Sequence, residues 1–229
     1  MAAQRITFYK FIPLEDFDAN KTIENLQNKN TSENYFIFSE QGDLFIRGCY
    51  YHDHPYTSPR YNVLTGEIEK MTIIKQHTVK FEIDLQDQTL MLWGGKKFTN
   101  ELLTEISLAS NGSVSIEEEI INFKKTISKI TKDGNIRITK LKIANVPIEK
   151  GILATCTISV DNIESQDAFV KRYAEKTMQL SISIFDNSID AEISNRTCAT
   201  LYSSGSFVVH KDRDSMSDET IDVLKRIII

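Results

Sequence analysis

Apolar and charged residues alternate strictly between Val79 and Leu85, and this alternation constrains the fold more than any other feature of the 229-residue sequence. Successive side chains of a strand point to opposite faces of a sheet, so the pattern predicts a strand with one buried and one solvated face. Such strands are typical of antiparallel sheets. The apolar positions are Val79, Phe81, Ile83 and Leu85, and the charged positions between them are Lys80, Glu82 and Asp84.

Turn residues separate short apolar segments along the whole chain. Gln86–Gln88 links the alternating strand to a second strand at 89–93, and Gly94-Gly95 ends that strand before a helix predicted over 99–109. Short links of this kind predict an α+β fold of antiparallel sheets built from β-hairpins, with interspersed amphipathic helices. We expect regions 1–110 and 111–229, either as two similar half-domains or as one continuous domain. The proline-containing segment 52–62 is predicted to be an irregular loop.

A second helix is predicted over 116–131, with Ser115 as its N-cap. Three glutamates would occupy its first turn and lysines its end, as the helix dipole favours. Its inward-facing stripe would be Ile116, Ile120, Phe123, Ile127 and Ile130.

Positive charge is concentrated in the middle of an otherwise acidic chain. The formal net charge is −5, yet residues 94–150 hold ten Lys/Arg against seven Asp/Glu. Basic side chains on a helix and the adjoining strand are suited to contacts with nucleic-acid phosphates, although they can also be a solvated helix surface. The candidate nucleic-acid-binding residues are Lys96, Lys97, Lys124, Lys125, Lys129, Lys132, Arg137, Lys140 and Lys142.

The segment Gly94-Gly95-Lys96-Lys97 lies where a strand is followed by a helix. Free amides at a helix N-terminus attract anions, and glycine permits close approach of a phosphate, but the spacing matches neither a Walker loop nor a dinucleotide-binding fingerprint. The alternative is a tight turn with exposed lysines.

His52-Asp53-His54 would place two imidazoles on one side of a strand. Together with Glu82 and Asp84 they are the nominees for a metal-dependent nuclease, but no third ligand has a matching spacing. We therefore predict no metal, no cofactor and no catalytic residue. Cys49, Cys156 and Cys198 form no CxxC pair and indicate free thiols.

The C-terminal segment ends in apolar residues that could bind a protein partner, with Leu224, Ile227 and Ile228 as interface candidates. The alternative is that this helix, predicted over 217–228, packs on the protein's own sheet. The sequence contains no secretory signal and no apolar segment long enough to span a membrane, so we expect a cytoplasmic protein.

The stretch Val79–Asp84, followed by Leu90–Trp93, two lysines and an amphipathic helix, resembles a segment of the RdgC family of recombination-associated, DNA-binding proteins. The layout is also similar to that of the related RexA phage-exclusion proteins, and Phe8, Tyr9 and Phe11 supply aromatic residues in the opening strand as in both families. The resemblance implies an α+β homodimer that binds duplex DNA with little sequence preference, in phage defence, phage exclusion or recombination control. It implies no catalytic residues.

The leading hypothesis from the sequence is therefore a DNA-binding protein. The alternatives are a protein-binding subunit of an anti-phage defence complex and a metal-dependent nuclease.

Overall fold

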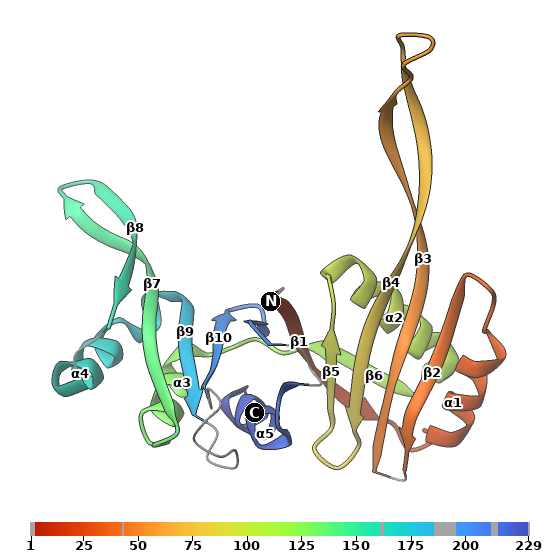
Figure 1. Ribbon diagram of the computed structural model, residues 1–229. Coiled ribbons are helices and arrows are strands. Elements are labelled where there is room, and N and C mark those ends of the chain that lie inside the picture. Colours follow the sequence, from red (N-terminus) through yellow and green to blue (C-terminus); the bar gives the residue numbers. More distant parts are fainter. Residues whose placement is uncertain (1–2, 43, 161–162, 186–195, 212–214, 229) are drawn as a thin grey trace. The chain divides into compact units, whose positions relative to one another are not determined.

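The computed structural model describes residues 3–42, 44–160, 163–185, 196–211 and 215–228. It divides the chain into two compact units (Figure 1). Unit A comprises residues 9–117, and unit B combines residues 1–8 with residues 118–229. The sequence-based boundary after residue 110 lies near the second division, but nothing in the sequence indicated that residues 1–8 belong with the C-terminal part.

Both units consist of antiparallel strands joined by hairpins and accompanied by amphipathic helices, which confirms the α+β class. No helix of the described residues is both long and apolar enough to cross a membrane.

Unit A contains four strands that pair in the order β2-β3-β4-β5, together with two helices. The later part of β1 also belongs to this unit. The elements are β1 (Gln4–Pro13), α1 (Ala19–Asn28), β2 (Asn34–Gln41), β3 (Phe45–Tyr61), β4 (Ile68–Asp84), β5 (Thr89–Trp93), α2 (Lys96–Ala109) and β6 (Val114–Glu118).

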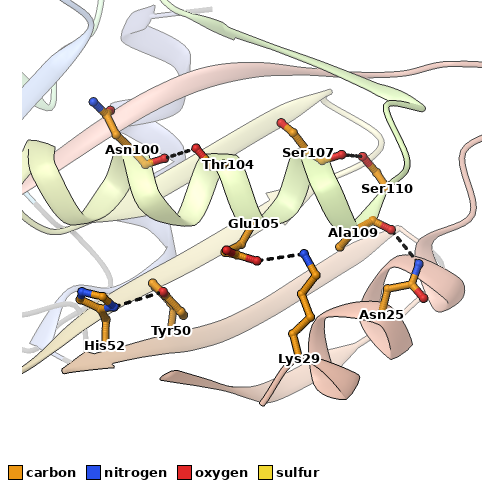
Figure 2. Close-up of polar contacts among 10 residues, drawn as sticks. All are labelled: Asn25, Lys29, Tyr50, His52, Asn100, Thr104, Glu105, Ser107, Ala109 and Ser110. Atoms are coloured by element: carbon orange, nitrogen blue, oxygen red, sulfur yellow. Dashed lines mark hydrogen bonds and ion pairs between the residues drawn. The ribbon is translucent and has the colours of Figure 1, made fainter. Parts of the chain in front are cut away.

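The helices α1 and α2 bury their apolar stripes in the core of unit A. Ile23 and Leu26 of α1 and Leu102 and Ile106 of α2 are at most 5% exposed and belong to one cluster with Phe81 of the sheet. Polar contacts join the two helices at their edges (Figure 2). The Asn25 amide donates to the Ala109 carbonyl at 2.8 Å, and Lys29 pairs with Glu105 at 3.0 Å.

The strands β3 and β4 are far longer than the sequence predicts. Residues 52–61 continue β3 instead of forming a loop, and the alternating strand predicted from Val79 is the last part of a longer strand that begins at Ile68. Pro55 and Pro59 are compatible with this ribbon because β2 pairs with β3 only as far as His52, so beyond that point β3 is an edge strand. The ribbon extends beyond the rest of its unit as a two-stranded arm (Figure 1).

Unit B contains an antiparallel sheet with the strand order β1-β11-β10-β9-β7-β8. Its remaining elements are α3 (Phe123–Ile130), β7 (Ile136–Glu149), β8 (Ile152–Ser159), α4 (Ile163–Tyr173), a short 3₁₀ helix (Ala174–Lys176), β9 (Thr177–Phe185), β10 (Arg196–Tyr202), β11 (Ser206–Val209) and α5 (Asp218–Ile228).

The helix predicted over 116–131 is wrong in its first half. Residues 114–118 form strand β6, and α3 begins at Phe123 with Asn122 as its N-cap, whose side chain accepts from the Lys125 amide at 3.2 Å. Ile120, predicted to face inward, is 76% exposed, whereas Phe123, Ile127 and Ile130 are buried as expected. Spacing alone misassigned this segment, because Ile116 packs from strand β6 against the core of unit A, whereas α3 belongs to unit B.

Candidate nucleic-acid interface

The sheet of unit B has two chemically different faces. One face is apolar, and its central side chains are at most 2% exposed. Buried residues of α3 and α5 cover this face, and the Thr126 hydroxyl of α3 donates to the Ile227 carbonyl of α5 at 3.4 Å. The apolar-face residues include Ile6, Ile138, Leu141, Leu180, Ile182, Leu201 and Phe207.

Strand alternation places five basic side chains on the opposite face, which we call the open face. They are Arg5, Arg137, Lys140, Lys142 and Arg196, and all but the partly buried Arg5 are exposed. A register shift in β7 after Ile138 keeps Arg137 and Lys140 on the same side although three positions separate them.

Residues with hydroxyl groups lie between these cations. Across the register, Arg137 is opposite Ser183 and Lys140 is opposite Ser181, while Thr200 of β10 is opposite Ser181 on its other side. The described strand residues of this sheet at 4–8, 136–143, 152–159, 177–185, 196–202 and 206–209 include no Asp or Glu. No acid within these segments therefore neutralises the cations, and Glu149 lies at the far end of β7.

Serine hydroxyls hold two of the arginines against the sheet. Arg196 Nε donates to Ser183 Oγ at 2.9 Å, and an Arg5 guanidinium nitrogen donates to Ser206 Oγ at 3.1 Å. A guanidinium has five N–H donors, so each arginine keeps further donors for an anion. The Arg137 guanidinium lies 5.8 Å from the centre of the Phe185 ring. Ordered cations of this kind lose less entropy on binding than mobile ones do.

The structure divides the nine basic residues predicted from the sequence. Arg137, Lys140 and Lys142 belong to the open face. The lysines of α3 lie on the other side of the sheet, because α3 covers the apolar face.

Lys124 pairs with Glu175 at 2.8 Å, and this contact raises the pKa of Lys124 and lowers that of Glu175. Lys129 donates to the Arg226 carbonyl at 3.1 Å near the end of α5. Lys125 and Lys132 are exposed, and Lys132 follows the end of α3.

Lys96 and Lys97 lie in unit A, in the first turn of α2. The N-cap is Gly95, which makes no side-chain capping bond. A Cβ at Gly94 would lie 3.2 Å from the Val79 side chain, so this glycine serves close packing of the strand. Lys97 contacts His54, with 2.6 Å between Nζ and Nε2. Gly94 and Lys97 therefore have structural roles that require no bound phosphate.

The residues considered for nuclease chemistry take part in other contacts. Glu82 is 4% exposed and forms an ion pair with Arg47 at 3.1 Å. Asp84 accepts the backbone amides of Gln86 and Asp87 at 3.1 and 3.0 Å. Within the described ranges, no three His, Cys, Asp or Glu side chains are arranged to hold a metal ion.

The C-terminal interface candidates are mostly part of the core. Leu224 and Ile227 are 0% and 2% exposed, and Ile228 is partly buried. This packing agrees with the alternative reading of the sequence, in which α5 covers its own sheet. All three cysteines carry free thiols, and Cys198 is exposed on the open face.

Sequence reasoning missed Arg5 and Arg196, which are isolated basic residues outside the charged central segment. For Arg196 the signal was alternation, because Arg196, Cys198, Thr200 and Tyr202 alternate with Thr197, Ala199 and Leu201, all of which are buried. No protein-family model and no curated protein matches this chain. The similarity to the RdgC family therefore remains a prediction.

Proposed function

We propose that this protein binds duplex DNA through the open face of unit B. The supporting observation is that five cations, Arg5, Arg137, Lys140, Lys142 and Arg196, share one sheet face, and that the described strand segments around them, at 4–8, 136–143, 177–185, 196–202 and 206–209, include no Asp or Glu. On a chain of net charge −5, such a face attracts a polyanion locally and orients its approach.

The proposed contacts are mainly with phosphates. Arginine and lysine donate strong charge-assisted hydrogen bonds to phosphate oxygens, and the neighbouring hydroxyls of Ser181 and Thr200 can add neutral ones. A sheet face that lies along the backbone places no element in the major groove, where bases are distinguished. We therefore expect little sequence preference. The proposed role in phage defence, phage exclusion or recombination control rests on the RdgC resemblance alone.

Fluorescence anisotropy with labelled duplexes of unrelated sequence, at rising salt, tests this function. Five phosphate contacts predict that log K falls with log salt with a slope of roughly −4.5, and that affinity is similar for all sequences. Absence of binding at low salt would rule the function out.

Protein binding is the second candidate function, and the β3–β4 arm favours it. Large apolar side chains near its tip are unusually exposed: Val63 by 83%, Leu64 by 96% and Ile68 by 72%. Exposed apolar clusters on a soluble domain commonly mark contacts with other proteins.

Replacing Leu64 and Ile68 with serine tests whether the arm joins two copies of the chain. Light scattering should show a dimer for the wild type and a monomer for the folded variant. If the two masses are equal, the arm does not join two copies.

A further inference from the structure

Three histidines of unit A meet the first turn of α2 at the root of the β3–β4 arm. His52 and His77 are directly opposite each other in the β3–β4 register, and His54 follows on the same side of β3. The ring centres of His52 and His54 are 6.0 Å apart, and those of His54 and His77 are 6.4 Å apart. The His77 ring stacks on Phe98 of α2 at 3.9 Å, with an angle of 17° between the ring planes.

The contact between His54 and Lys97 requires a neutral imidazole. An ammonium group has only donors, so His54 Nε2, 2.6 Å from Lys97 Nζ, must be the acceptor. A proton on Nε2 would remove that acceptor and place two cations side by side. Lys75, opposite His54 in the register, adds a further positive charge.

His77 is also favoured in its neutral form. Its Nε2 lies 2.6 Å from the Tyr56 hydroxyl. Burial, followed by the positive charges of Lys75, His54, His52 and Lys97, lowers the pKa of His77 below its ordinary value of 6.5.

His52 has different partners. Its Nε2 is 3.2 Å from the Glu101 carboxylate of α2. Its Nδ1 is 3.4 Å from the Tyr50 hydroxyl (Figure 2). Burial, with Glu105 and Glu101 nearby, raises the pKa of Tyr50 to about 12, so this hydroxyl keeps its proton and can donate to Nδ1. Glu101 is the acid that faces the cluster from α2, and protonation of His52 would strengthen that pair. His54 and His77 are therefore the acid-sensitive members.

We propose that His54 and His77 form an acid-sensitive contact that holds the first turn of α2 against the root of the β3–β4 arm and releases it when they are protonated. The direction of the pH effect follows from the difference in proton binding between the closed and the opened form. With both imidazoles uncharged the contact is intact. As the pH falls below 6.5, the opened form takes up protons more readily than the closed form because the pKa of His77 is lower in the closed form. Opening therefore becomes more favourable.

Hydrogen exchange of the full chain tests this proposal. Amide exchange of the peptide covering residues 96–102, corrected for the intrinsic rate, is compared at about pH 7.5 and about pH 5.5. In the wild type, the corrected rate should rise several-fold at the lower pH, because protonation favours the opened form. Peptides of α5 in unit B should show no such change.

Two variants separate this contact from general acid sensitivity. His54→Gln with His77→Gln keeps hydrogen-bond acceptors but cannot titrate, so the rise should shrink to less than about twofold. His210→Gln, which removes an exposed histidine in unit B, should respond like the wild type. Should the double variant fold poorly, Lys97→Met should weaken the pH response by removing one repelling charge. The proposal would be overturned by a wild-type exchange rate that does not change with pH. An exchange rate of the folded double variant that rises as much as that of the wild type would also overturn it.

Discussion

At the residue scale, Gly205 is a position where a side chain has no room. Its φ is +70°, a conformation that favours glycine, and a Cβ there would collide with the Glu119 carbonyl. Two backbone segments of unit B pass too closely at this point for any side chain to fit.

Gly205→Ala should therefore lower the free energy of unfolding by about 2–4 kcal/mol, through the unfavourable φ and the steric clash together. Gly112→Ala is the matched control, because its φ of +77° is similar but its Cβ would meet nothing within 4 Å. The control should lose only about 1 kcal/mol. Equal losses in urea denaturation would show that the close approach to Glu119 is unimportant.

Residue patterns predicted the alternating strand well but not the role of every charge in it. Val79, Phe81 and Ile83 are buried as alternation requires. Glu82 is buried too, because Arg47 of the neighbouring strand reaches it. Alternation identifies the two sides of a strand, but it does not reveal which cross-strand partner covers a charge.

At the scale of elements, the start of α3 distinguishes the structure from the sequence-based prediction. Ser115 and Asn122 are both good N-cap residues, so local chemistry alone permits either start. Tertiary pairing decides, because residues 114–118 pair with β1 as a strand.

Asn122→Ala should lower the free energy of unfolding by about 1 kcal/mol, since it removes the hydrogen bond to the Lys125 amide. Ser115→Ala should change it by less than about 0.5 kcal/mol. Thermal denaturation followed by circular dichroism measures both. A larger loss from the serine variant would favour a helix that begins at residue 116.

The arm shows the same limit of local reasoning. Two prolines and several polar residues made 52–62 look like a loop, yet residues 52–61 pair with β4. Only the knowledge that β3 has a single partner there makes the prolines acceptable.

At the scale of the whole molecule, the sequence predicted the fold class and part of the candidate site. It identified Arg137, Lys140 and Lys142 because they lie in a dense basic segment. It could not separate them from the α3 lysines, because only the packing of α3 on the apolar face puts the two groups on different sides. Nor could it join Arg5 and Arg196 to them, since the sheet brings together residues almost two hundred positions apart.

The central claim is that the open face, and not the lysine surface of α3, binds DNA. The most direct test compares two charge-reversed variants of equal net charge by anisotropy at several salt concentrations. The first is Arg137→Glu, Lys140→Glu and Lys142→Glu. The second is Lys124→Glu, Lys125→Glu and Lys132→Glu, which leaves Lys129 in its contact with α5.

Both variants should fold, because exposed charges contribute little to stability. The first should bind duplex DNA far more weakly than the wild type and flatten the salt slope by roughly 0.9 for each contact removed. The second should keep a slope close to that of the wild type. Wild-type affinity in the first variant, or equal losses in both, would contradict the account.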